Sequence, residues 1–540
     1  MARRGRPYNP FTESPLTKST YINYNHSEST LSYIKDRFAH IPEGAGALFF
    51  IQMFSTLGFA VLYFTLDLYS TKHLHFSTQE AAGILGVFGA FNYGLHLFGG
   101  YLGGRFLSNR NLFVLGMAFQ VFGCACISVG NIELLYWGLA LFLTGCGLNV
   151  TCINMMLTQR FKPEDIRREG AFIWNYAGMN VGFAIGFIVA GHFQLNEDYR
   201  SMFIFATIGN FLAIVLAFFN WSAIGDLDTT LLTVSKKDFN LRFIAGVAIM
   251  TLLVPTLWFL LQHRDGTEIL IKIICGVVAI TLIYLTIRHK DLREKRNMSA
   301  YLILAVGSLV FWTLYQLTPS ALQQFADNNV DRNVWGIEIA PVWIQNINTI
   351  ILVLGGPLMS AMFVRLRARG WNIDVPKQFS TSLILMGVGT LALPLGIYLA
   401  DDKGMVAFVW LFTFYVFQSL GELLISPVGY AMIGRLAPRQ YQGIMMGSWM
   451  LLTGLASLLA RDLASSIPEP SASAAMSTNP AYKSLFSQLG WGTVAVGVVL
   501  VALIPFLTKL IKDKETPTTP EELIKLAETD AVTEYLPPAA

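Results

Sequence analysis

Residues 405–434 read MVAFVWLFTFYVFQSLGELLISPVGYAMIG, an apolar run with an acid, Glu422, near its middle. As an α-helix, a run of this length is longer than the bilayer hydrocarbon core, which is about 30 Å thick. The run therefore predicts a membrane-spanning helix. Glu422 needs its own explanation, because an ionisable side chain in a span costs about 2.5–3.5 kcal/mol on insertion scales and often marks a substrate or proton pathway.

The composition of the whole chain is that of a membrane protein. Of 540 residues, 54% are hydrophobic and 14% are charged, whereas soluble domains carry about 25% charged residues. The net charge of +3 gives no indication of nucleic-acid binding. The cysteines lack metal-ligand spacing and predict small core residues, with no metal or cofactor; they are Cys124, Cys126, Cys146, Cys152 and Cys275.

The apolar blocks predict an all-α membrane protein with about fourteen transmembrane helices. The first block begins near Gly46, too late and too long for a cleaved signal peptide. The predicted spans are 46–70, 80–104, 112–130, 134–158, 171–192, 201–223, 243–262, 269–287, 301–325, 342–364, 379–399, 405–433, 444–464 and 489–508. They divide the chain into a cytoplasmic tail (1–44), a six-helix bundle (45–225), a linker with two additional helices (226–298), a second six-helix bundle (299–512) and a C-terminal cytoplasmic tail (513–540), which we expect to be mostly disordered.

Basic residues predict the orientation of these spans. With a cytoplasmic N-terminus, the inner loops and the segment after the last span hold 23 Lys and Arg residues, and the outer loops hold 7. Both termini are therefore expected in the cytoplasm. Two six-span halves around a basic connection are typical of a transporter built from repeats.

Helix-breaking residues and glycines also interrupt the predicted spans. Pro319 and Pro427 lie within them, and Gly178, Gly182 and Gly186 recur at every fourth residue of the fifth span. The glycines fit either a hinge or static close packing of two helices.

Glu422 lies next to groups that favour binding of a cationic amine. Ser426 follows four residues later on the same helical face. Pro427 leaves the carbonyl of Leu423 without its usual helical donor. A protonated or packing-bonded acid is the alternative, and we favour the functional interpretation.

Other polar residues lie in several spans. Asp67 is near the outer end of the first span, where a carboxylate can reach interfacial water, and Arg461 and Asp462 are expected to neutralise each other. His96 can titrate near neutral pH, although a lone histidine is more often a bonded core residue. The uncharged group predicts a central polar cavity, because it is spread over both halves; it comprises Asn92, Tyr93, Asn175, Tyr176, Asn180, Tyr315, Gln316, Asn346, Asn348 and Trp449.

Several segments resemble the proton-dependent oligopeptide transporters of the major facilitator superfamily. These are GELLISPVGYAMIGRLAP (421–438) with GIMMGSWMLLTG (443–454), NYAGMNVG (175–182), VFWTLYQLTPSALQQFADNNVDRNVWG (310–336) and QNINTIILVLGGPL (345–358). The resemblance covers about residues 45–510. It implies the major facilitator fold, two six-helix bundles that rock around a central site, with two extra helices between them.

The resemblance also implies roles for individual residues. Glu422 matches the acid that holds the amino group of the peptide, and Asn180, Asn348, Ser426 and Trp449 match other cavity positions. We add Tyr93, Tyr176 and Tyr315 as predicted substrate-binding residues.

The first half departs from the family pattern at its charged positions. The ExxER motif aligns with FFIQMFSTLGF (49–59), so that its charged residues become Gln52, Ser55 and Thr56, and the lysine of the fourth span becomes Val150. None of these side chains exchanges a proton near neutral pH. Any proton coupling would then fall to Glu422, with His96 second. A site with an acid and no cation favours neutral or C-terminally blocked ligands that carry an amine.

The sequence therefore predicts an inner-membrane transporter of di- and tripeptides or peptide-like amines, working by alternating access. Its partners would be the small-molecule substrate, the bilayer and, if transport is coupled, protons. Two alternatives are an uncoupled facilitator or exporter of a non-peptide metabolite, and a transport-inactive receptor or scaffold. An enzyme is not indicated, because no nucleophile–base pair or metal cluster is evident.

Overall fold

The computed structural model describes residues 44–161, 167–371, 373–438, 440–469 and 474–511. The predictions for the two tails fall almost wholly outside these residues. Among the described residues, fourteen helices are long and apolar enough to cross a membrane. The predicted number of spans is confirmed.

The first half of the chain forms six long helices. They are α2 (Ala45–Leu68), continued by the π-helical turn η1 (Tyr69–His73), α3 (Thr78–Leu102), α4 (Asn109–Ile127), α5 (Ile132–Thr158), α6 (Arg167–Leu195) and α7 (Tyr199–Phe219). Local sequence sets several of the boundaries. Ser77 and Glu80 form a reciprocal capping box at the start of α3, and the side chain of Asn131 caps α5. We call this group of six helices the first bundle.

Two more helices follow a short 3₁₀ turn, η2 (Thr230–Thr233). They are α8 (Lys236–Gln262) and α9 (Arg264–Arg288), separated by His263 alone. We call them the linker hairpin.

The second half contains six long helices and some short elements. The long helices, the second bundle, are α10 (Leu292–Tyr315), α12 (Gln345–Ala368), α13 (Val375–Tyr398), α14 (Phe408–Leu436), α15 (Gln442–Ala464) and α16 (Ala474–Ile511). Between α10 and α12 lie α11 (Ala321–Asn329), the strands β1 (Val330–Asp331), β2 (Asn333–Val334) and β3 (Ile337–Glu338), and η3 (Pro341–Ile344). β1 pairs in parallel with β4 (Val406–Ala407), and β2 pairs with β3 in an antiparallel hairpin.

The structure corrects three predicted boundaries. The predicted span 301–325 is broken, since α10 ends at Tyr315 and α11 begins at Ala321; Pro319 lies in the break, as expected for a residue that cannot continue a helix. α10 begins at Leu292, inside the predicted linker 226–298. α16 begins well before the predicted residue 489.

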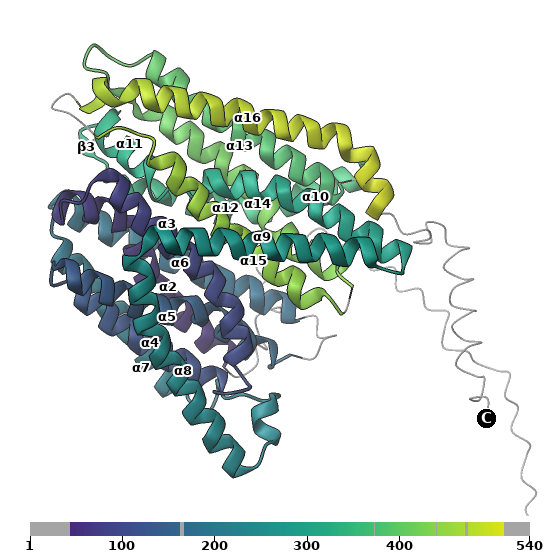
Figure 1. Cartoon of the computed structure of the whole chain (residues 1–540). Helices are drawn as coiled ribbons and strands as arrows, with labels where there is room; N and C mark the ends of the chain where they lie inside the picture. Colours follow the sequence, from purple (N-terminus) through teal and green to yellow (C-terminus); the bar gives the residue numbers. More distant parts are fainter. Residues whose placement is uncertain (1–43, 162–166, 372, 439, 470–473, 512–540) are drawn as a thin grey trace, which may run out of the picture.

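Each bundle has its own hydrophobic core. One core of buried residues comes mostly from residues 45–271, and the other comes mostly from residues 282–507. In Figure 1 the first bundle, purple to blue, lies below the second bundle, green to yellow. Contact between the bundles runs mainly through α3 against α15 and α6 against α12. The arrangement is two packed bodies with a seam between them.

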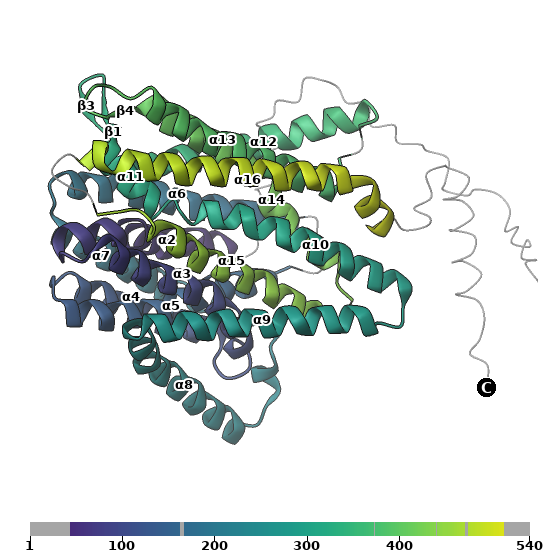
Figure 2. The same cartoon turned by 45° about the horizontal axis from the view of Figure 1, so that its top comes forward.

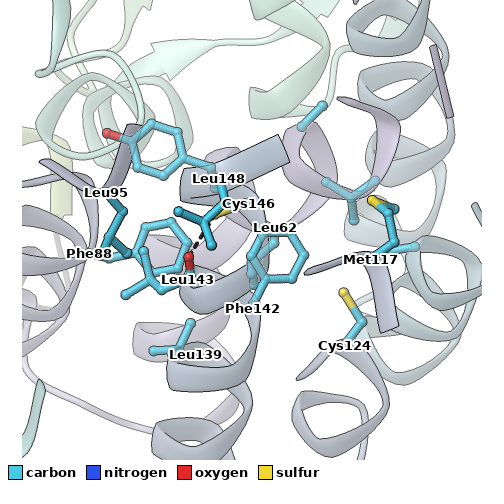
Figure 3. Close-up of a cluster of buried hydrophobic side chains, with 14 of the residues drawn as sticks. Leu62, Phe88, Leu95, Met117, Cys124, Leu139, Phe142, Leu143, Cys146 and Leu148 are labelled. Carbon is cyan, nitrogen blue, oxygen red and sulfur yellow. Dashed lines mark hydrogen bonds between the residues drawn. The ribbon is translucent and has the colours of Figure 1, made fainter. Parts of the chain in front are cut away.

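Cysteines form part of the first core. Cys124, Cys146 and Cys152 are buried and unpaired, and Cys126 and Cys275 are partly buried. Figure 3 shows Cys124 and Cys146 among apolar neighbours, with the Cys146 thiol 3.9 Å from the carbonyl oxygen of Leu143. The three buried residues match the interpretation as small core residues.

The regularly spaced glycines of α6 pack directly on α2. A Cβ at Gly178 would lie 2.8 Å from the carbonyl oxygen of Phe49, and one at Gly182 would overlap the carbonyl oxygen of Met53. Of the two interpretations of this pattern, the structure shows the close packing of helices.

Polar contacts between the bundles gather at one end of the molecule, which we call the sealed end. Tyr63 donates a hydrogen bond to Gln316 Oε1 at 2.7 Å, and Lys72 pairs with Asp327 at 2.6 Å. Gln324 Nε2 donates to Asp67 Oδ2 at 2.7 Å. Asp67 is 1% exposed, so the expectation that it reaches interfacial water is wrong. The adjoining helix α11 covers it.

The linker hairpin touches both bundles at the sealed end. α8 packs on α5, whereas α9 contacts both α3 and α15; Figure 2 shows α9 along the boundary between the bundles. Arg461 of α15 pairs with Glu268 and Asp265 of the hairpin, and Asp462 pairs with Lys272 at 2.9 Å. The prediction that Arg461 and Asp462 neutralise each other is therefore wrong, because each has its own partner on α9.

Candidate substrate cavity

A cavity of about 690 Å³ lies between the two bundles. Its volume falls within the usual range for small-molecule sites, about 300–1,000 Å³. Helices α2 to α6 line one side, and α10, α12, α14 and α15 line the other. The lining extends to Asn154 and Phe172, near the ends of α5 and α6 that lie away from the sealed end. The predicted central polar cavity is confirmed.

Glu422 lies in the cavity wall on α14. It is 7% exposed, and Asn348 Nδ2 donates to its Oε2 at 2.8 Å. The same amide nitrogen is 3.1 Å from Ser419 Oγ, and the side chain of Tyr315 is a further hydrogen-bonding neighbour of the carboxyl. The described hydrogen-bond donors around the Glu422 carboxyl are therefore neutral, and no cationic side chain is among them. Its second oxygen is suited to an ammonium group from a ligand.

Ser426 and Trp449 complete the wall on this side of the cavity. Ser426 lies one turn beyond Glu422 and is partly exposed, and Pro427 lies within α14. Trp449 is 2% exposed. Its indole ring fills the space beside Gly429, where an added Cβ would overlap the ring. Gly429 therefore determines where the Trp449 ring can lie.

The first-bundle wall is polar and uncharged near α2. Gln52 Nε2 donates to Thr56 Oγ1 at 2.8 Å, and Ser55 Oγ donates to the carbonyl oxygen of Gln52 at 3.0 Å. The positions that align with the charged ExxER residues therefore satisfy one another. On α6, Asn180 Nδ2 donates to the carbonyl oxygen of Tyr176 at 2.9 Å.

His96 and Val150 line the same side. His96 Nδ1 lies 2.6 Å from the carbonyl oxygen of Asn92, so this nitrogen carries the proton and Nε2 remains available. The ring stacks on that of Tyr93, with centroids 6.1 Å apart. Val150 presents an apolar side chain where the resemblance implies a lysine.

The structure thus brings every predicted site residue to one cavity. The residues are Gln52, Ser55, Thr56, Tyr93, His96, Val150, Tyr176, Asn180, Tyr315, Asn348, Glu422, Ser426 and Trp449. Two of the other polar positions, Gln316 and Asn346, do not line it; Gln316 bonds to Tyr63 in the seam instead.

Sequence reasoning missed several lining residues. Gln120, Asn149, Asn154, Thr349 and Thr453 belong to the wall as well. Each is a polar residue inside a predicted span, the same signal that identified Asn180 and Asn348.

The charge of the lining is one-sided. Among the lining residues that the structure describes, Glu422 is the carboxyl, and Lys and Arg do not occur. The described lining therefore holds a buried acid without a Lys or Arg side chain to pair with it.

Comparison with known proteins identifies the family of the chain. The sequence model of the family described as the POT family (PTR2) matches residues 110–483, which is more than half of the chain. The chain belongs to the POT family.

Relatives match this POT family member over nearly their full length. Dipeptide and tripeptide permease B of Salmonella typhimurium is 28% identical over 476 residues, which cover 87% of this chain and 96% of the permease. Dipeptide and tripeptide permease A of Cronobacter turicensis is 28% identical, with 88% of this chain and 96% of the permease covered. Both relatives are named as permeases.

Solved structures share the fold. A crystal structure of peptide transporter POT in complex with sulfate has a TM-score of 0.77 at 23% identity and covers 88% of this chain and 97% of that one. A POT family transporter in complex with 5-aminolevulinic acid has a TM-score of 0.75 at 21% identity, with 87% and 98% covered. This POT family member is a multi-pass membrane protein with the major facilitator fold.

Proposed function

We propose that this chain transports di- and tripeptides, or peptide-like amines, across a bacterial inner membrane by alternating access. The carrying observation is the position of Glu422. It is a buried carboxyl in the cavity between the bundles, held by Asn348 at 2.8 Å and without a cation among its lining neighbours. The named activity of the permease relatives supports the peptide class.

In this proposal, Glu422 binds the protonated amine of the substrate. The amine supplies the missing positive charge and takes up the carboxylate oxygen that Asn348 leaves free. The side chains of Tyr315, Asn348 and Ser426 then determine the direction in which the rest of the substrate extends from its amine.

The two cores supply the moving bodies. Each bundle keeps its own packing while the seam between them opens at one end and closes at the other. The described conformation has the sealed end closed. The distribution of basic residues assigns this end to the periplasm and both termini to the cytoplasm, so the cavity in this conformation faces inward.

Proton coupling would run through the cavity acid. The first-span positions are Gln52, Ser55 and Thr56, which do not titrate near neutral pH. Glu422 is then the first carrier to test and His96 the second, because both line the cavity.

Uptake into proteoliposomes tests the function. The full chain would be reconstituted, and uptake of labelled Ala-Ala and its C-terminal amide would be measured with and without an inward proton gradient. We expect saturable uptake, with KM raised by about 30-fold or more in Glu422→Gln, since removing one partner of a desolvated charge pair costs about 2 kcal/mol or more. Glu133→Gln, at the exposed start of α5, is the matched control and should behave as wild type.

The outcomes separate the hypotheses. Accumulation driven by the gradient and lost in Glu422→Gln would assign proton coupling to this residue. Equilibration without accumulation would indicate a facilitator. Absence of uptake of both compounds by folded wild-type protein would refute peptide transport and favour a receptor or a non-peptide transporter.

A further inference from the structure

Opposite Glu422, the cavity has a second polar region of different character. Its wall includes Gln120 of α4, Asn149 of α5 and Asn175 of α6, which are 1%, 4% and 7% exposed. We call these residues the amide pole. All are uncharged, and all lie on the first bundle, whereas Glu422 lies on the second.

The amide pole has acceptor oxygens without partners. Gln120 Oε1, Asn149 Oδ1 and Asn175 Oδ1 are buried and form no hydrogen bond. An unpaired buried acceptor is unfavourable, and a ligand donor that reaches it would relieve that cost.

At Gln120 and Asn149, Met117 explains why the oxygen and not the nitrogen of each amide is left unpaired. Asn149 Nδ2 lies 2.8 Å and Gln120 Nε2 lies 3.5 Å from Met117 Sδ. A thioether sulfur can accept a hydrogen bond but cannot donate one. The two NH₂ groups are therefore directed at the sulfur, so the unpaired atoms are hydrogen-bond acceptors, which in this conformation are covered by the surrounding helices.

Electrostatics gives an independent reason to exclude a carboxylate. Two extended residues place a peptide carboxylate about 7 Å from its amine. Because Glu422 would hold the amine at a hydrogen-bond distance of about 3 Å, the carboxylate lies about 10 Å from Glu422, where two like charges in an effective dielectric constant of about 20 repel enough to weaken binding about 15-fold. The described lining holds neither Lys nor Arg to offset this repulsion.

We propose that the substrate is a cationic amine without a carboxylate, whose far end donates N–H hydrogen bonds to the amide pole. A peptide with an amidated C-terminus is the simplest member of this class. The inference rests on the proposed function, since it assumes that Glu422 holds the amine. It adds a selection at the far end of the substrate, against a carboxylate and in favour of N–H donors.

A matched set of ligands tests the inference on the full purified chain. Affinities of Ala-Ala, Ala-Ala-amide and N-acetyl-Ala-Ala-amide would be measured by calorimetry, and uptake of the first two would be compared in proteoliposomes. We expect the amide to bind at least about tenfold more tightly than the free acid, and the acetylated compound, which lacks the amine, to bind weakly.

The failures of the two proposals are distinguishable. If Ala-Ala binds and is transported as well as its amide, the substrate class is refuted while peptide transport stands. If the acetylated amide binds as well as the free amine, the role of the cation is refuted. If none of the three binds, both proposals fail.

A cation placed in the wall should reverse the selection. Val150 lines the cavity directly after Asn149, and Val150→Lys would supply a charge that pairs with a ligand carboxylate. We expect this variant to bind Ala-Ala at least about tenfold more tightly than wild type does, and the amide less tightly. Val150→Met adds length without charge and should keep the wild-type order.

A folded Val150→Lys protein that still prefers the amide would overturn the electrostatic argument. If this variant does not fold, the ligand series on the wild-type protein decides the matter alone.

Discussion

The seam at the sealed end should weaken when Gln324 is replaced by leucine. Gln324 Nε2 donates to Asp67 Oδ2 at 2.7 Å across the two bundles and also lies 3.2 Å from Thr71 Oγ1. Asp67 is 1% exposed, so Gln324→Leu leaves a buried acceptor without its donor. That loss costs about 1–3 kcal/mol in the sealed conformation, whereas water can replace the donor once the seam opens.

The expected population change follows from this energy. A cost of about 2 kcal/mol changes an equilibrium about 30-fold, so a sealed-to-open ratio of about 99:1 becomes about 3:1. Double electron–electron resonance would measure the two populations from the distance between two spin labels. The labels would be attached to cysteines introduced at Val129 and Asp402, which are exposed residues in sealed-end connections of the two bundles. The partly buried cysteines Cys126 and Cys275 would first be replaced by serine.

The control makes the same chemical change outside the seam. Gln488 of α16 bonds to Ser484 of its own helix at 3.0 Å, and Gln488→Leu should leave the label distances unchanged. A folded Gln324→Leu protein with the wild-type distance distribution would show that the Asp67–Gln324 bond does not hold the seam.

Three further predictions concern the hairpin, the helix packing and the cavity wall. Glu268→Gln should lower the apparent melting temperature of the purified protein, because breaking its buried pair with Arg461 costs about 3–5 kcal/mol. Asp265→Asn removes an exposed carboxylate and should change the melting temperature little, so equal shifts in the two variants would contradict this account. Gly182→Leu should abolish the folded monodisperse peak in size-exclusion chromatography, since its Cβ would overlap the Met53 carbonyl, and Gly492→Ala, with open space around it, should be tolerated. Gly429→Ala should leave the protein folded but weaken ligand affinity at least about tenfold, because the Trp449 ring must move. Calorimetry would measure the affinity, and an unchanged value would mean that the position of the ring does not affect binding.

Local sequence was sufficient to predict the spans and most of the polar residues that line the cavity. Each span is a contiguous apolar block. Glu422, Asn180 and Asn348 stand out within these blocks because polar side chains are energetically costly in a bilayer and often mark a functional site. The spread of the polar positions over both halves predicts that they converge on one cavity, because the fold brings the faces of many helices together.

Pairings between distant residues were beyond the sequence. Arg461 and Asp462 are adjacent, and mutual neutralisation was the simplest prediction, yet their partners lie on α9, nearly two hundred residues away. Asp67 was misjudged for the same reason, since α11 returns to cover it only after the break at Pro319. The unpaired oxygens of Gln120 and Asn149 likewise depend on Met117, whose role is invisible until α4 and α5 are packed together.

The linker hairpin bears on how the protein is made. The core of the first bundle draws on residues up to Ile271, with only a few later additions such as Ala340 and Val342. Emerging from the ribosome, the chain can therefore complete most of one hydrophobic body before the other exists. Along the sequence, the change from the first core to the second falls within α9. A chain cut at the 289–291 connection should therefore yield two fragments that each hold most of one core and that reassemble when they are produced together. Synthesis and transport would then share one boundary, since the bodies that fold in turn are the bodies that move.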